Sequence, residues 1–158
     1  MNTVERIAKL KALLAHDGVR AALIFLNSLT THRFTALYRF DGDMLKNLYF
    51  YDREHPEIDS SDEVPILASY CVFVRQSGQR FDVTDSLRDE RVCGHPKRMQ
   101  VQSYCGVPLM DENGEMFGTM CHFDVRPMPI TSANIELMEA LAPLLKERER
   151  LIPSSTGG

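Results

Sequence analysis

The residues with the clearest capacity for chemistry in this 158-residue sequence are its four cysteines: Cys71, Cys93, Cys105 and Cys121. They form no Cys-x-x-Cys pair and no cleavable leader is evident, so we expect free thiols in a reducing cytoplasm. A thiol becomes a nucleophile where its surroundings favour the thiolate. Cys93 lies in a charged segment, two residues from an arginine and two from a histidine. If one cysteine is redox-active, the sequence therefore favours Cys93.

The other three cysteines have a simpler interpretation, because free cysteine is among the most often buried residue types and packs as a small apolar side chain. Cys105 and Cys121 lie inside predicted strands, and Cys71 lies in an apolar stretch predicted to be helical. We expect all three to contribute to the core.

A metal site would have to combine Cys93 and His95 with Cys121 and His122. Zinc sites favour tightly paired ligand spacings, which this set does not have. Strand alternation also places Cys121 and His122 on opposite faces of a sheet. We therefore expect no metal site.

Composition restricts the class of protein. The chain is 44% hydrophobic and 25% charged, which is typical of one globular domain with its own core. Lys and Arg number 18 against 22 for Asp and Glu, a net charge of −4, which leaves no basic surface for nucleic acid or anionic membranes. The compact apolar run at 21–26 is too short to span a membrane. We expect a cytoplasmic protein without nucleic-acid or membrane partners.

The elements that position the cysteines follow from hydrophobic periodicity and turn signals. Asp41-Gly42 and Asn113-Gly114 are typical of the tight turns of hairpins. The predicted helices are 3–18, 19–31, 65–77 and 132–145, and the predicted strands are 34–40, 45–51, 81–84, 103–110 and 115–125.

This order predicts an α+β fold with helices flanking an antiparallel sheet. We expect one domain over residues 1–152 and a flexible tail over 153–158. Pro143 lies inside the last predicted helix, where proline costs about 3 kcal/mol, so we expect a kink or break there.

The last third of the chain contains an ordered set of motifs: Tyr104-Cys-Gly-Val-Pro-Leu109, the Asn113-Gly114 turn, Phe117-Gly-Thr-Met-Cys121, and then Asp124 and Arg126-Pro127. This set resembles a GAF domain. It implies an antiparallel sheet with the N- and C-terminal helices on one face. On the other face it implies a small-molecule pocket roofed by a helix and loop.

Strand alternation then assigns side chains to the implied pocket. If Tyr104 and Gly106 face it, Cys121 and Phe123 should face it too, and His122 should lie on the opposite face. The candidate ligand-binding residues are Tyr70, Cys71, Asp85, Cys93, Tyr104, Cys121 and Phe123.

The resemblance implies a sensory or regulatory module in signal transduction that binds an unidentified small molecule without catalysis. The terminal helices carry apolar positions such as Leu10 and Leu13, which favour a parallel helical homodimer. An output domain downstream is the further partner that the family implies.

Two alternatives stay open. One branch of the family resembles free methionine-R-sulfoxide reductase, an enzyme with a nucleophilic thiolate and resolving thiols, for which Cys93 and Cys71 would be the catalytic residues. Several positions depart from that pattern: a serine at 61 replaces a cysteine, and Tyr104, Cys121 and Phe123 replace acidic residues. The second alternative is a dimerisation domain that binds no ligand.

A covalent bilin is a further option that the family raises, because the phytochrome branch anchors its chromophore on a cysteine in this region. That branch has a Cys-His pair, whereas Gly94 follows Cys93 here. The sequence does not favour a bilin.

Overall fold

The computed structural model describes residues 1–151, with side chains through residue 145, so the expected tail at 153–158 lies outside the described residues. The described chain forms four α-helices and a six-stranded sheet, which confirms the predicted α+β class. The helices are α1 (Thr3–His16), α2 (Val19–Ser28), α3 (Cys71–Ser77) and α4 (Ser132–Leu151). The strands are β1 (Phe34–Asp41), β2 (Met44–Asp52), β3 (Val64–Pro65), β4 (Phe81–Val83), β5 (Ser103–Met110) and β6 (Met116–Asp124).

The sheet is antiparallel throughout, in the order β3-β2-β1-β6-β5-β4. Both predicted hairpins form, β1 with β2 and β5 with β6. The two hairpins join where β1 pairs with β6, with Phe34 opposite Phe123 and Ala36 opposite Cys121. The centre of the sheet therefore combines strands from the two ends of the chain.

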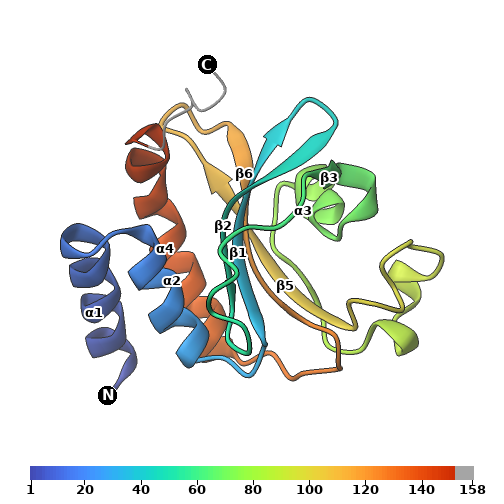
Figure 1. Cartoon of the computed structure of the whole chain (residues 1–158), viewed down its shortest axis with the longest axis horizontal. Helices are drawn as coiled ribbons and strands as arrows, with labels where there is room; N and C mark the ends of the chain where they lie inside the picture. Colours follow the sequence, from blue (N-terminus) through green and yellow to red (C-terminus); the bar gives the residue numbers. More distant parts are fainter. Residues whose placement is uncertain (152–158) are drawn as a thin grey trace.

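Helices α1, α2 and α4 form two layers on one face of the sheet (Figure 1). α2 and α4 pack directly on the strands, and α1 packs outside them against both helices. Apolar residues of the three helices meet the sheet residues Leu37, Cys105, Val107, Leu109 and Met120 in one core. None of the helices within residues 1–151 is both long and apolar enough to cross a membrane.

Burial in this core overturns part of the expected dimer contact. Leu10 is only 1% exposed and packs inside the chain, so it is not a spare apolar position. Leu13 is half-buried against the same core. Helical periodicity correctly predicted an apolar face on α1, but α2 and α4 of the same chain cover that face.

α4 continues without interruption through Pro143 to Leu151, so the predicted break is absent. Leu141 and Leu145 are buried on either side of the proline. Their packing against the core stabilises both halves of the helix and offsets the lost backbone hydrogen bond.

The segment 64–78 crosses the opposite face of the sheet (Figure 1) and differs from the single helix predicted there. It comprises β3, a 3₁₀ turn at Ile66–Ala68 and α3. Ser69 between them is extended, with φ −130° and ψ 153°. α3 ends as predicted at Gly78, which has a φ of 69° that glycine adopts at little cost.

Candidate functional site

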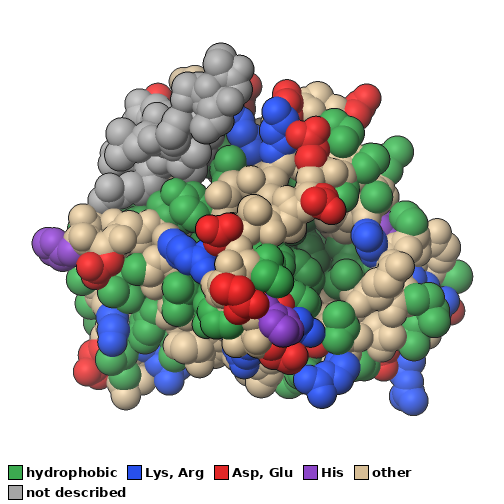
Figure 2. Space-filling view, viewed as in Figure 1, with side chains coloured by type: hydrophobic (Ala, Val, Ile, Leu, Met, Phe, Trp, Pro, Cys, Tyr) green, Lys and Arg blue, Asp and Glu red, His purple; other side chains and the backbone are tan. Residues whose placement is uncertain are grey.

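A cavity of about 350 Å³ lies between the 64–78 segment and the face of the sheet opposite the helical layers. Figure 2 shows the surface hollow in this region, with hydrophobic side chains inside it. Its walls come from β1, β2, β3, β5 and β6, the 3₁₀ turn, the start of α3 and two loops. The lining residues are Phe34, Tyr38, Leu45, Phe50, Ser61, Asp62, Val64, Ala68, Ser69, Tyr70, Cys71, Lys97, Val101, Tyr104, Cys121 and Phe123.

Aromatic rings form much of the wall. Phe34 stacks on Phe123 with ring centroids 4.8 Å apart, and it also contacts Phe50 at 5.7 Å. Tyr70 meets Tyr104 edge-to-face at 5.6 Å. Such a wall favours flat or aliphatic molecules, because aromatic side chains offer large apolar contact areas.

The register of β5 with β6 explains which side chains reach the cavity. Tyr104 lies opposite Phe123, and Gly106 lies opposite Cys121. These residues share one face, and Tyr104, Cys121 and Phe123 line the cavity as alternation predicted. His122 lies on the other face, where its ring stacks on His32.

The floor of the cavity contains a hydrogen-bonded thiol. The Tyr104 hydroxyl donates to Cys71 Sγ at 3.3 Å, and Thr119 Oγ1 lies 3.1 Å from the same sulfur. Cys121 belongs to the same buried cluster and lines the same cavity. The Cys71 sulfur therefore has two hydroxyl neighbours, from β5 and β6, inside a largely apolar site.

These contacts make the two thiols unequal. Burial raises the pKa of the Cys71 thiol, but its polar neighbours Cys121, Ser69, Thr119 and Tyr104 outweigh burial and bring that pKa below its usual value. Burial, and then the neighbouring Cys71, raise the pKa of Cys121 well above its usual value. Cys71 is thus the more acidic of the two thiols.

Tyr104 remains a proton donor to this sulfur. Burial, and then the neighbouring thiols, raise the pKa of its hydroxyl well above the ordinary value. The ring fits because Gly106 lies beneath it: a Cβ at position 106 would overlap the phenol end of Tyr104. The glycine of the Gly-Val-Pro-Leu motif therefore makes room for the hydroxyl that contacts Cys71.

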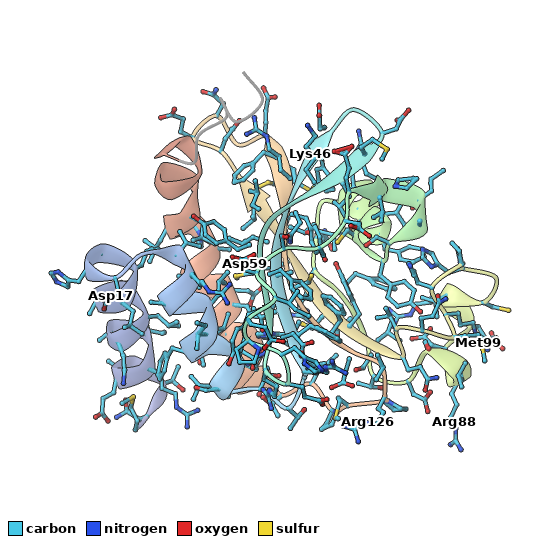
Figure 3. All side chains as sticks on the ribbon, in the orientation of Figure 1. Asp17, Lys46, Asp59, Arg88, Met99 and Arg126 are labelled. Carbon is cyan, nitrogen blue, oxygen red and sulfur yellow. The ribbon has the colours of Figure 1, made fainter. Side chains whose placement is uncertain are left out.

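Two predicted site residues lie elsewhere. Asp85 accepts a hydrogen bond from the Leu87 backbone N–H at 3.2 Å and is not among the cavity-lining residues. Cys93 is exposed at the end of a 3₁₀ turn and also lies outside the lining. This part of the chain lies at the edge of the molecule, where Arg88 and Met99 point into solvent (Figure 3). The structure therefore brings together Tyr70, Cys71, Tyr104, Cys121 and Phe123 of the predicted set.

Sequence reasoning missed several residues of the site. Thr119 precedes Cys121 by two positions in the same strand, so alternation alone could have identified it. Phe34, Tyr38 and Phe50 come from the first hairpin, and only the β1–β6 pairing brings them to the cavity. Apart from Ser69, the groups that lower the pKa of Cys71 lie 33 or more positions away and leave no local signal.

A second buried polar cluster lies on the helical side of the sheet. Asn27 Nδ2 donates to Thr35 Oγ1 at 2.8 Å, and Thr35 Oγ1 lies 2.7 Å from His122 Nδ1. His32 Nδ1 lies 2.8 Å from Thr30 Oγ1. Burial lowers the pKa of His32 to about 4 and that of His122 to about 3, so both rings are neutral at pH 7.

No group of three or more His, Cys, Asp or Glu within the described part of the chain is arranged to hold a metal ion. The candidate set of Cys93, His95, Cys121 and His122 is dispersed. Cys121 faces the cavity, His122 faces the helices, and Cys93 is exposed at the surface.

Together, the fold and the cavity define an α+β domain that covers one face of its sheet with terminal helices and keeps a pocket on the other. Residues 9–146 match the GAF domain family, so the chain belongs to that family and the resemblance in its last third is confirmed. A comparison with curated proteins gives no match.

Solved structures agree on the fold. The GAF domain of an Acinetobacter phosphoenolpyruvate-protein phosphotransferase superposes with a TM-score of 0.77 at 12% identity, covering 100% of both chains. Free methionine-R-sulfoxide reductase from Neisseria meningitidis, in complex with its substrate, gives 0.72 at 15% identity, over 97% of this chain and 91% of that one. The chromophore-binding domain of Stigmatella aurantiaca phytochrome P1 gives 0.73 at 12% identity, over 92% and 59%. These similarities establish the fold. Because one fold can carry different functions, any ligand has to be inferred from the residues that line this cavity.

Proposed function

We propose that this GAF domain is a regulatory module that binds a small, largely apolar molecule in the cavity between the sheet and α3. The observation that carries the proposal is the cavity itself, about 350 Å³ with aromatic walls and a polar floor at Cys71. This volume is near the lower end of the range for ligand sites, roughly 300–1,000 Å³. A single-ring or short aliphatic molecule fits that size and lining.

The polar groups around the cavity suggest how such a molecule is oriented. Cys71 and Tyr104 lie at the floor. Asp62 and Lys97 contribute charges to the lining. Ser61 Oγ is shielded from solvent and makes no hydrogen bond of good geometry with the described part of the chain, so a ligand could satisfy it. We expect a ligand with one polar group and an apolar body.

In this proposal the protein is a cytoplasmic signalling module without catalysis, its domain spans residues 1–152, and homodimerisation uses the terminal helices. Leu10 is unavailable for that contact, whereas Val4 on α1 is 75% exposed and can contribute. A conformational change caused by ligand binding between α3 and the sheet would be transmitted to a partner domain through the helical layers on the opposite face.

The test is a binding measurement with indole, phenol and benzoate as probes, by thermal shift and calorimetry. A probe at 100 times its Kd should stabilise the fold by about 2.7 kcal/mol. Ala68→Phe places a ring at the cavity wall and should abolish the stabilisation, because Ala68 is a lining residue that is only half-buried. Leu67→Phe is the matched control, since Leu67 is 72% exposed next to it. Equal stabilisation of both variants would exclude binding in this cavity. If none of the probes stabilises the unmodified protein, the result would favour a dimerisation domain without ligand.

Free methionine-R-sulfoxide reduction is the competing function, supported by the fold and by the hydrogen-bonded thiol of Cys71. The two cysteines expected to carry it do not meet, because Cys71 lies at the cavity floor and Cys93 is exposed outside the lining. Turnover of free methionine-R-sulfoxide with dithiothreitol, lost in Cys93→Ser, would establish the enzyme and overturn the non-catalytic proposal.

A further inference from the structure

Lys97 is a basic residue of the cavity lining whose side chain has no acidic partner in the described part of the chain. It is half-buried beside an otherwise largely apolar space. Other basic side chains near the cavity are engaged: Lys46 lies 2.9 Å from a carboxylate oxygen of Asp41, and Arg98 donates to the carbonyl of Ser86 at 3.1 Å. A half-buried ammonium gains free energy from an anionic partner, so Lys97 points to an anion that the chain itself does not supply.

Backbone hydrogen bonds hold the turn that carries Lys97 against the cavity wall. The Lys97 N–H donates to His95 Nδ1 at 3.0 Å, and the Lys97 carbonyl accepts from the Val101 N–H at 2.8 Å. The Tyr70 hydroxyl donates to the Val101 carbonyl at 2.9 Å. Tyr70 and Val101 line the cavity themselves. The backbone position of Lys97 is therefore fixed before any ligand binds, which lowers the entropy cost of using it.

His95, two residues before Lys97, adds no charge to this side of the cavity. Its Nδ1 accepts the Lys97 backbone proton, so the ring proton is on Nε2, which lies 3.2 Å from the carbonyl oxygen of Ser69 and donates to it. Burial lowers the pKa of His95 below its usual value, in agreement with a neutral ring. Lys97 is thus the cation that this loop brings to the lining.

We propose that the cavity binds a small organic monocarboxylate, with its apolar body against the aromatic wall and its carboxylate at Lys97. The inference rests on the proposed function of the same cavity and adds the chemical class of the ligand. One ammonium balances one negative charge, so a monoanion suits the site better than a phosphate dianion.

The floor of the cavity does not need the charged group of the ligand. Cys71 Sγ already has the Tyr104 hydroxyl at 3.3 Å and Thr119 Oγ1 at 3.1 Å. The stacked rings of Phe34 and Phe123 instead offer apolar contact area to the body of a ligand. The apolar body therefore occupies the aromatic part of the cavity, and the carboxylate belongs on the side of Lys97.

Ser61 is a further hydrogen-bond donor in the lining. Its backbone N–H donates to Asn47 Oδ1 at 3.2 Å, which attaches the loop to β2. Its hydroxyl is shielded from solvent and has no partner of good geometry among the described residues. A hydroxyl can donate to a carboxylate oxygen, so the lining offers an anion more than the charge of Lys97.

Asp62 is the opposing charge in the lining, and Figure 2 shows acidic as well as basic side chains around the hollow. Asp62 is exposed, whereas Lys97 is half-buried. Water and salt weaken the field of an exposed charge more than that of a partly buried one. The lining therefore favours an anion over an organic cation, and the two residues give opposite predictions that can be measured.

The test is isothermal calorimetry of the full chain with benzoate, benzamide and benzylamine. These probes share one ring and differ in charge: negative, neutral and positive. Benzoate should bind at least about tenfold more tightly than benzamide, because a hydrogen bond to a charged group is stronger than one between neutral groups. Benzylamine should bind more weakly than benzamide.

Variants assign the preference to Lys97. Lys97→Gln should lower benzoate affinity at least about tenfold and leave benzamide affinity within about twofold. Lys97→Arg keeps the charge and should keep the preference for benzoate. Asp62→Asn removes an exposed negative charge and should raise benzoate affinity about twofold. Lys11→Gln is the matched control, because it removes the same charge from an exposed position on α1. Thermal denaturation checks that each variant is folded.

Four outcomes would overturn the inference. Benzylamine binding more tightly than benzoate, and weakened by Asp62→Asn, would identify a site for organic cations. Equal losses of benzoate affinity in Lys97→Gln and Lys11→Gln would reduce the preference to net charge. If benzamide binds as tightly as benzoate and Ala68→Phe abolishes both, the carboxylate inference fails while ligand binding in the cavity stands. If none of the three probes binds, the proposed function fails together with the inference.

Discussion

The imidazole rings of His32 and His122 stack on each other inside the protein, with centroids 5.9 Å apart and planes inclined by 8°. Both side chains are almost fully buried, and the Nε2 atom of each has no hydrogen-bond partner among the described residues. Two stacked rings without a counter-ion at Nε2 are stable only while both are uncharged.

Stability should therefore fall on acidification. The pKa of each histidine is lowered from 6.5, to about 4 for His32 and about 3 for His122, so the folded state binds fewer protons than the unfolded chain between pH 6.5 and 4. In that window each histidine should remove up to about 1.4 kcal/mol of unfolding free energy per pH unit of acidification. Urea denaturation from pH 7 to 4 measures this slope. The double variant His32→Gln, His122→Gln should show a shallower slope, and an unchanged slope would contradict the assignment.

Gly106 and Gly118 of the second hairpin should differ in how well they tolerate substitution by alanine. A Cβ at Gly118 would overlap the backbone carbonyl oxygen of Tyr38 on the neighbouring strand, whereas a Cβ at Gly106 would meet only the phenol end of Tyr104. Gly118→Ala should cost about 2–4 kcal/mol because β1 and β6 must separate, and Gly106→Ala about 1 kcal/mol. Chemical denaturation of both variants checks the order. Equal losses would mean that β1 can shift away from β6 as easily as the ring of Tyr104 can move.

Alkylation should distinguish the four thiols. Cys93 is exposed, and Cys71, Cys105 and Cys121 are buried. A charged reagent such as iodoacetate should therefore modify Cys93 in the native protein, and the other three only after opening or unfolding. Peptide mapping over time gives the order, and in Cys93→Ser the fast phase should vanish. Early modification of Cys105 would contradict the packing of β5 against α4.

The ion pair of Arg33 with Asp52 should contribute more than that of Lys46 with Asp41. Arg33 donates to both carboxylate oxygens of Asp52 at 2.8 Å, and the Asp52 side chain is 4% exposed. Asp52→Asn should lower the unfolding free energy by about 2–3 kcal/mol, because the partly buried guanidinium loses its bidentate partner and keeps only the longer contact with Glu54 at 3.5 Å. Asp41→Asn is the control, since that pair is largely exposed and should change stability little. Similar losses in the two variants would argue against a special role for the buried pair.

Local patterns predicted much of this fold. Alternation and the Asp-Gly and Asn-Gly turns gave both hairpins, and the same alternation put Tyr104, Cys121 and Phe123 on one face. Helical spacing gave α1, although Leu10 is buried by neighbouring helices rather than by a second copy of the chain.

The site itself was less predictable, because its geometry depends on contacts between distant residues. Extended Ser69 interrupts the segment predicted as one helix and lets α3 begin at Cys71, over β6. The charged neighbours of Cys93 suggested a reactive thiol, yet that residue is exposed and outside the cavity. Hydrogen bonds to Cys71 come from residues 33 and 48 positions later, and no local pattern contains them.

The pairing of β1 with β6 also determines when the cavity can form during translation. The β1–β2 hairpin leaves the ribosome more than sixty residues before β6, so β1 has an unpaired edge during that interval. Phe34 of β1 and Phe123 of β6 stack across this pairing and together form one wall of the cavity. The pocket therefore cannot form on a nascent chain until residues 116–124 have emerged, and a product truncated before β6 should expose an apolar strand edge that invites aggregation.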